Sequence, residues 1–335
     1  MTPFLRSLPL LLGLAALGWL CVHFGLADLG TALARADFAD LLAYACAAVM
    51  VVLGYSVRWR LVAYTAAPPP RLRRLVAARL AGDAVGALLP GGKLGGDPVR
   101  IALTAGDGRG GVRASAGVAI DRVMELISNS VCGLVYLSVF SLSRGGIAPT
   151  VPLVLLTTLV VPLLGLLTLV GVLRAQRRPF TPAVVRLAAR IPRLRGALAA
   201  VEQTEDVLIA FFRDHPWRFV LGVLGSLLIE VGILVEYHFL LAAFGIVLDV
   251  PTLLAVVMAS GLTHIVPTPA GVGALEAGEV AVLGLASGRP DLGFVVGMVL
   301  RLHEVLWTVV GLLVLLVRGM SFTRLRLLAA RKAAV

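Results

Sequence analysis

The sequence contains little cysteine and almost no lysine, and it lacks the short motifs of several enzyme classes. Its three cysteines, Cys21, Cys46 and Cys132, lie in separate apolar stretches without C-x-x-C spacing. We therefore expect inert core thiols, with neither a disulfide framework nor a redox pair. There is no G-x-x-x-x-G-K-S/T loop and no H-x-x-x-H pair, which excludes nucleotide hydrolysis through that loop and argues against metal catalysis. We expect no cofactor and a protein that is not an enzyme.

Apolar residues, in contrast, are abundant. Hydrophobic residues make up 59% of the 335 residues, and the mean hydropathy is +0.96. A soluble domain could not cover that much apolar surface with polar groups, so the composition predicts an all-α polytopic membrane protein. About six apolar runs are long enough for full spans. They are Leu8–Leu26, Phe38–Val57, Val123–Leu142, Val151–Leu173, Phe219–Phe244 and Leu292–Val317.

Two further apolar segments are interrupted by glycine and proline. They read G-A-L-L-P-G-G-K-L-G-G-D-P-V-R from Gly86 to Arg100 and T-H-I-V-P-T-P-A-G-V-G-A-L-E-A-G-E from Thr263 to Glu279. A bilayer tolerates irregular backbone only where protein or a water-filled cavity satisfies the freed N–H and C=O groups. Matched breaks in two halves of a chain therefore indicate a transporter-like binding site.

The positions of these breaks predict how the chain is organised. Half a helix of ~13 residues reaches about 20 Å, which is more than half of a hydrocarbon core of ~30 Å. Each broken segment is therefore expected to form a re-entrant helical hairpin, one near 75–103 and one near 252–286. The two hairpins are expected to have opposite orientations in two inverted halves, 1–144 and 145–335, of a single membrane domain, and to meet near the midplane.

Positive charge predicts the orientation in the membrane, because Lys and Arg concentrate in cytoplasmic loops. Arginines follow the expected second span at Arg58 and Arg60, and they also follow the first hairpin, the fourth span and the last span. The remaining loops hold at most one arginine each. This pattern predicts a multi-pass protein of the cytoplasmic (inner) membrane with both termini in the cytoplasm. The net charge of +11 borders the apolar spans, which indicates contact with anionic lipid headgroups and no nucleic-acid partner.

The first hairpin carries the residues expected to bind an anion. A half-helix N-terminus exposes N–H groups and a partial positive charge, and glycines let a ligand approach the backbone. Asp97 suits the N-cap, and Lys93 and Arg100 add positive charge, so the site favours a phosphate. A charge within the membrane is costly, which makes function the default interpretation of Lys93. Alternatively, Lys93 snorkels to an interface or pairs with Asp83 or Asp97.

The second hairpin repeats this arrangement with acidic side chains. Glu276 and Glu279 lie one helical turn apart. They could carry protons or hold a cation, or they could form salt bridges with Arg100, Arg122 or Arg301. The residues expected to bind substrate in the two hairpins are Pro90, Gly92, Lys93, Gly95, Gly96, Asp97, Arg100, Pro267, Gly271, Gly273 and Glu276.

Polar side chains within three spans are expected to face a common interior. Arg122 and Glu125 share a helix face, as do Arg301 and Glu304. We expect each of these two pairs to be an internal ion pair that fixes packing. The residues that could couple protonation or line the path are Arg122, Glu125, Glu230, His264, Glu279, Arg301 and Glu304.

Three motifs in order resemble one family. They are L-P-G-G-K-L-G-G-D-P-V-R ending at Arg100, I-D-R-V-M-E-L from Ile120 to Leu126, and V-P-T-P-A-G-V-G-A-L-E from Val266 to Glu276. Together they resemble the transmembrane domain family of lysylphosphatidylglycerol synthases, flippase-like membrane proteins that include hopanoid biosynthesis-associated members. The family's elements would fall on Pro90, Gly92, Gly95, Asp97, Arg100, Arg122, Pro267, Gly271, Gly273 and Glu276. The family more often has Glu near Asp97.

The resemblance runs from about the second span to the last and implies the flippase portion of these proteins. Members with synthase activity carry a soluble catalytic domain after the membrane part, and this chain ends soon after its last expected span, so that activity is not implied. We expect translocation of an anionic phospholipid or lipid-linked precursor. The alternatives are a transporter of a small hydrophilic solute, an intramembrane lipid-headgroup transferase and a partner subunit in lipid biosynthesis. The partners expected are membrane lipids, with a homo-oligomer or a lipid-biosynthesis enzyme as further candidates.

Overall fold

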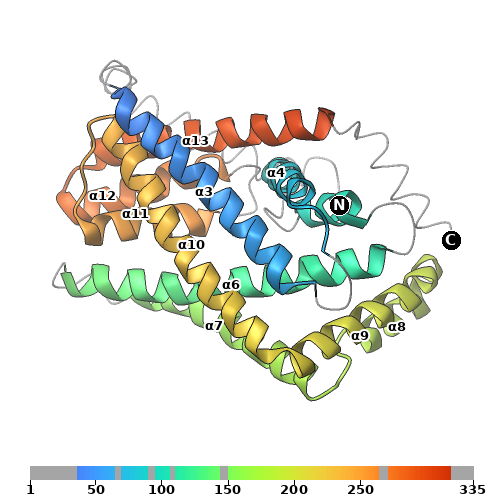
Figure 1. The fold of residues 1–335 in the computed structure, drawn as a ribbon. Helices are drawn as coiled ribbons and strands as arrows, with labels where there is room; N and C mark the ends of the chain where they lie inside the picture. Colours follow the sequence, from blue (N-terminus) through green and yellow to red (C-terminus); the bar gives the residue numbers. More distant parts are fainter. Residues whose placement is uncertain are drawn as a thin grey trace.

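The computed structural model describes residues 36–64, 69–89, 95–105, 110–143, 150–263 and 271–317. Every regular element in these ranges is a helix, which confirms the all-α class (Figure 1). The elements are α3 (Phe38–Val62), α4 (Leu72–Leu88), α5 (Asp97–Ala105), α6 (Gly111–Ser143), α7 (Thr150–Arg174), α8 (Thr181–Arg190), η2 (Pro192–Ala197), α9 (Leu198–Asp214), α10 (Pro216–Ala243), α11 (Val250–Thr263), α12 (Ala274–Ser287) and α13 (Pro290–Val317).

Within the described ranges, five helices are long and apolar enough to cross a membrane, namely α3, α6, α7, α10 and α13. They coincide with five of the six predicted runs, and the multi-pass membrane class is confirmed. The sixth run, Leu8–Leu26, lies outside the described residues. One boundary was wrong, because α3 continues past Val57 to Val62 and contains Arg58. Arg58 is buried in an ion pair and is therefore not a loop charge.

Each of the two broken segments forms a pair of short helices. In the first segment α4 packs against α5, and in the second α11 packs against α12. The connections, at 90–94 and 264–270, lie outside the described residues. The hairpins are also joined through longer helices, since α4 packs on α13 and α11 packs on α6. Whether both hairpins return to the side of the membrane they enter stays a prediction, as does the inverted orientation of the two halves.

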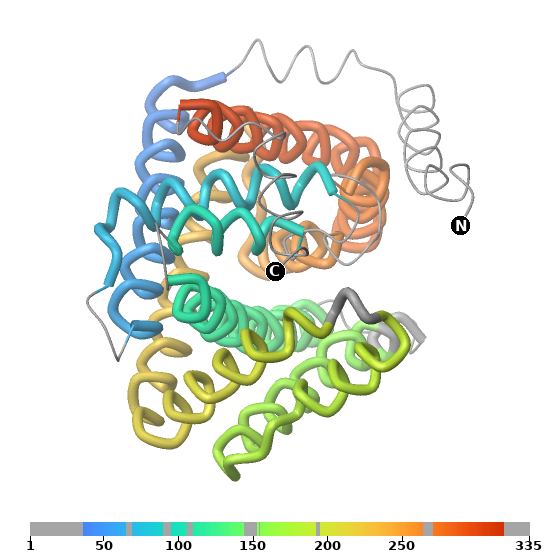
Figure 2. The backbone as a smooth tube through the Cα atoms, turned by 90° about the vertical axis from the view of Figure 1, so that its right-hand side faces the viewer, coloured from blue at the N-terminus to red at the C-terminus, as the bar shows by residue number. Residues whose placement is uncertain are grey.

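The long helices surround these short ones. α3 and α10 pack side by side and cross the molecule diagonally (Figure 1). α6 is the most enclosed of the five long apolar helices, and it packs against α5, α7, α9, α10 and α11. α7 is the least enclosed and lies at the edge of the bundle beside α6 and α9 (Figure 2). This difference between α6 and α7 positions the site described below.

Local sequence signals set the start of individual helices. Asp37 is the N-cap of α3, and its carboxylate accepts hydrogen bonds from the N–H groups of Ala39 and Asp40 at 2.8 and 3.1 Å. The expectation for Cys46 was wrong: its side chain is exposed on α3, whereas Cys132 is buried. A helix that is apolar on all sides gives no sequence signal for which of its faces is inside.

Candidate functional site

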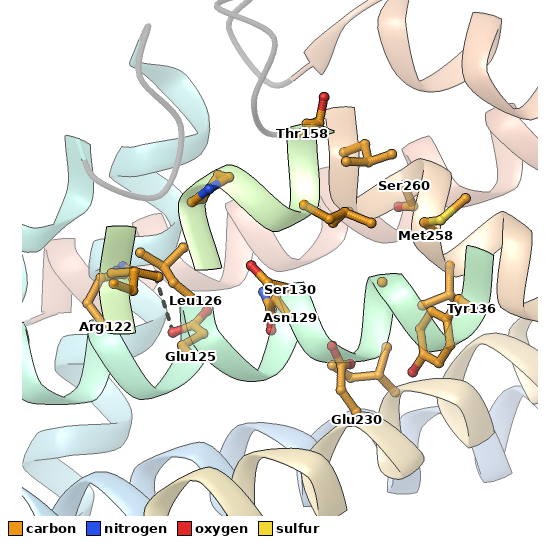
Figure 3. Close-up of a pocket in the computed structure, with 18 of the residues that line it drawn as sticks. Arg122, Glu125, Leu126, Asn129, Ser130, Tyr136, Thr158, Glu230, Met258 and Ser260 are labelled. Carbon is orange, nitrogen blue, oxygen red and sulfur yellow. Dashed lines mark ion pairs between the residues drawn. The ribbon is translucent and has the colours of Figure 1, made fainter. Parts of the chain in front are cut away.

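A cavity of about 810 Å³ lies between α6, α7, α10 and α11 (Figure 3). Its volume falls in the range of ~300–1,000 Å³ that is usual for ligand pockets. Its lining is mainly apolar, with polar side chains gathered along α6 and α10. The residues that line it include Arg122, Glu125, Asn129, Ser130 and Tyr136 from α6, Glu230 and Tyr237 from α10, and Met258, Ser260 and Gly261 from α11.

One end of the cavity carries charge. Arg122 and Glu125 form an ion pair at 3.2 Å, and Asn129 follows on the same face of α6. Glu230 of α10 lines the cavity farther along (Figure 3). Among the described residues, the charged lining is one guanidinium and two carboxylates, and all three lie on helices. Charged groups on rigid elements can hold a polar ligand in one orientation.

The opposite wall of the cavity is a single layer of helix, formed by α7. Leu159, Pro162 and Leu166 line the cavity, whereas Val161 and Leu164 point outward and are 66% and 57% exposed. Pro162 lies inside α7, where a proline removes one helical hydrogen bond and weakens the helix locally. A weakened helix with lipid on its outer face is a suitable place for a lateral opening.

Behind the cavity, the buried carboxylate of Asp121 in α6 binds three guanidinium groups. It accepts hydrogen bonds from Arg58 at 2.5 Å, from Arg100 at 2.5 Å and from Arg79 at 3.4 Å. Arg100 also lies over the ring of Trp59, with its guanidinium carbon 4.3 Å from the ring centroid. Asp121 and Arg100 are both 0% exposed. One carboxylate thus ties together α3, α4, α5 and α6.

A second group of ion pairs connects this network to the cavity. Arg79 donates to both oxygens of Glu125 at 3.2 Å and pairs with Asp83 at 3.3 Å. Arg122 donates to Asp97 at 2.7 Å. The first-hairpin network contains four arginines and four carboxylates, Arg58, Arg79, Arg100, Arg122, Asp83, Asp97, Asp121 and Glu125. Its formal charges are balanced, as buried charges require.

In the second hairpin, Glu276 forms the centre of a smaller network. Its carboxylate accepts hydrogen bonds from the N–H of Gly273 at 2.9 Å and from Arg301 at 2.8 and 3.1 Å. Arg301 also donates to Glu304 at 2.6 Å and to the carbonyl of Gly271 at 3.1 Å. Gly271 and Gly273 have φ of 59° and 78°, a conformation that side chains disfavour, so both positions suit glycine.

The two networks contain the same triad of acid, arginine and glutamate. The triads are Asp97, Arg122 and Glu125 in the first network, and Glu276, Arg301 and Glu304 in the second. In both triads the acid precedes the arginine by 25 residues, and the glutamate follows the arginine by three. The helix packing repeats as well, since α5 packs on α6 and α12 packs on α13. The contacts of one hairpin are thus repeated in the other at a fixed offset along the chain.

The structure brings some of the predicted site residues to the cavity and keeps others away. Arg122, Glu125 and Glu230 line it. Arg100 is enclosed in the first-hairpin network instead, and Gly96 lies where a Cβ would collide with the carbonyl of Gly82. Gly95 faces Leu89 across the first hairpin. The predicted residues that lie outside the described ranges are Pro90, Gly92, Lys93, His264 and Pro267.

The remaining predictions concern ion pairs. The pairs Arg122 with Glu125 and Arg301 with Glu304 are present, and Glu276 pairs with Arg301, one of its three candidate partners. The carboxylate of Asp97, at the start of α5, is held by arginines. Glu279 is 0% exposed and has no hydrogen-bond partner within the described ranges. In the described part of the chain, no three His, Cys, Asp or Glu side chains gather as a metal site would require.

Three residues of the cavity and the first-hairpin network were not predicted from the sequence. Arg79 has Asp83 as the only acidic side chain in α4, and Arg58 was assigned to a loop. Tyr55 lines the cavity and lies under the guanidinium of Arg79 at 3.8 Å. The available signal was the position of Arg58 and Arg79 within apolar helices, because an unpaired arginine there would be costly.

Comparison with known families agrees with this architecture. The family model described as the lysylphosphatidylglycerol synthase TM region matches residues 7–312. No match was found among curated proteins or among solved structures. The match covers the five long apolar helices almost completely, both hairpins and both triads. The chain belongs to the family of the lysylphosphatidylglycerol synthase TM region.

Proposed function

We propose that the protein moves an anionic phospholipid or lipid-linked precursor between the leaflets of the cytoplasmic membrane, with the lipid headgroup passing through the α6–α7–α10–α11 cavity. One observation carries this proposal: the cavity combines a charged end with an apolar wall that is one helix away from the surrounding lipid. Family membership supports a function related to membrane lipids.

The lining suits the two chemically different parts of a lipid. Arg122 offers a guanidinium to a phosphate. Glu125 and Glu230 offer carboxylate oxygens to headgroup hydroxyls, such as those of a glycerol or a sugar. Leu159 and Leu166 offer an apolar surface to the acyl chains. Such a lining favours a headgroup with a phosphate and hydroxyl groups.

The wall formed by α7 distinguishes lipid transport from transport of a small hydrophilic solute. A solute carrier needs a polar path that is closed toward the bilayer, whereas a lipid carrier needs a lateral opening for the acyl chains. α7 has a proline at Pro162 on the cavity side and exposed leucines on the other side. We propose that α7 moves away from α11 to admit the lipid.

Two matched tryptophan substitutions on α7 test this proposal. Leu166→Trp places a bulky indole ring in the cavity. Leu164→Trp places the same ring on the outer face of α7, where Leu164 is 57% exposed. In proteoliposomes with fluorescent anionic and zwitterionic phospholipids, we expect Leu166→Trp to slow translocation at least about tenfold, the effect of ~1.4 kcal/mol. Leu164→Trp should leave the rate unchanged.

A third variant tests headgroup selectivity in the same assay. Lys93→Ala should slow the translocation of anionic lipids more than that of zwitterionic lipids, because an ammonium group attracts a headgroup with a net negative charge. Wild-type vesicles that move no lipid faster than protein-free vesicles would refute lipid translocation. Equal rates for wild type, Leu166→Trp and Leu164→Trp would refute the cavity as the path.

A further inference from the structure

The repeated triads align Glu279 with a residue of opposite charge. One helical turn after the acid of each triad, the first hairpin has Arg100 and the second has Glu279. Arg100 is neutralised by Asp97 and Asp121. Glu279 is equally buried, but neither of its carboxyl oxygens has a hydrogen-bond partner among the residues that the structure describes. The same position thus holds a paired cation in one hairpin and an unpartnered acid in the other.

The packing around Glu279 is tight. α13 approaches the backbone of α12 at two glycines, Gly293 and Gly297. A Cβ at Gly293 would collide with the carbonyl of Glu279, and a Cβ at Gly297 would lie 2.9 Å from the Cα of Glu276. Small residues at such positions let two helices approach closely.

Among the described residues, the titratable groups around Glu279 do not include an available cation. Glu276, on the same helix, adds a like charge one turn away. From α13, Arg301 is already bound to Glu276 and Glu304, and His303 lies beside Glu236 of α10, with its Nδ1 3.5 Å from that carboxylate. Tyr237 of α10 interacts electrostatically with Glu279, Glu236 and Glu304, and its hydroxyl is bound to Ser260. α11 has no titratable side chain between Val250 and Thr263.

An ionised carboxylate is strongly disfavoured in such surroundings. An unpaired charge taken out of water is so costly that the group takes up a proton instead. In the second triad Arg301 already faces two carboxylates, Glu276 and Glu304. An ionised Glu279 would increase this excess of negative charge, whereas a protonated Glu279 leaves it unchanged.

We propose that Glu279 is a proton-binding site that couples lipid movement to the proton gradient. In this conformation the Glu279 carboxyl carries the proton. When α12 and α13 separate and water reaches the site, the O–H bond breaks and the proton passes to water. Coupling rests on the proposed lipid translocation, whereas proton binding by Glu279 does not.

The first test is infrared difference spectroscopy of the full-length protein during a pH titration. A protonated carboxylic acid has a carbonyl band that a carboxylate lacks. Glu279→Gln removes the acid but keeps the shape of the side chain, so the band should lose the contribution of one carboxylic acid. Glu276→Gln should keep the band, because the Glu276 carboxylate is bound in an ion pair with Arg301 and is not the source of the band. If Glu276→Gln does not fold, Glu304→Gln serves as the same control. A band of the same size in Glu279→Gln and in wild type overturns the proposal.

The second test measures coupling in proteoliposomes. With one proton moved per lipid, a gradient of one pH unit shifts the wild-type leaflet ratio up to about tenfold. Glu279→Gln should exchange lipid without a gradient and show no shift when the gradient is applied. Equal shifts in wild type and Glu279→Gln would overturn the coupling role. If wild type moves no lipid at all, the proposed function fails, and the infrared experiment still decides whether Glu279 binds a proton.

Discussion

Removing the charge of Asp121 tests whether the first-hairpin network holds the fold together. Asp121→Asn keeps the shape of the side chain but leaves three buried arginines without their shared carboxylate. Arg58 would keep the hydroxyl of Ser226 and the backbone carbonyl of residue 121, and Arg100 would keep Asp97 at 3.3 Å and the ring of Trp59. Breaking a buried ion pair from one side costs about 3–5 kcal/mol. We expect a loss of this size in the free energy of unfolding, a change of roughly 150- to 5,000-fold in the equilibrium constant.

The protein contains a matched surface pair that serves as the control. Asp206 binds Arg178 at 2.6 Å, almost the distance from Asp121 to Arg58, but the side chains of this surface pair are 55% and 44% exposed. Exposed pairs contribute about 0–1 kcal/mol, so Asp206→Asn should be nearly neutral. Reversible unfolding of detergent-solubilised protein by a denaturing detergent, followed by circular dichroism, measures both variants. Losses that agree within about 1 kcal/mol would refute the structural role of the network.

Two further predictions concern the packing of α13. In a double-mutant cycle, Glu276→Gln and Arg301→Gln should be coupled by about 0.5–3 kcal/mol in the same unfolding assay, and additive losses would contradict the pairing. Gly297→Ala should destabilise the protein by about 1–3 kcal/mol, because the added Cβ pushes α13 away from Glu276. Gly171→Ala is the control, because a Cβ added at Gly171 meets no atom within 4 Å; it should stabilise α7 by about 0.5–1 kcal/mol. Losses of equal size in Gly297→Ala and Gly171→Ala would exclude a packing explanation.

The parts of the fold that depend on local pattern were predictable from the sequence. Long apolar runs predicted α3, α6, α7, α10 and α13, and the glycine and proline breaks predicted where the short helices end. The spacing of Arg122 with Glu125 and of Arg301 with Glu304 predicted their pairing, since residues three apart lie on the same face of a helix.

The parts that depend on distant contacts were not predictable in this way. Arg58 binds Asp121 from another helix, and its place next to an apolar run made it resemble a cytoplasmic loop charge. The two faces of α7 have the same composition, so the residues that line the cavity could not be told from those that face lipid. Pairing between helices far apart in the chain gives no periodic signal in the sequence.

The buried position of Arg58 also affects how the nascent chain enters the bilayer. An arginine at the centre of a lone membrane helix costs about 2.5–3.5 kcal/mol on insertion scales. Asp121 follows Arg58 by 63 residues and Arg79 by 42, so α3 and α4 are synthesised before the carboxylate that neutralises them. We therefore expect these helices to stay in the insertion machinery or at the membrane interface until α6 emerges. The segment from α3 to α6 then partitions into lipid as one unit, and biogenesis of the first hairpin becomes a late, concerted step.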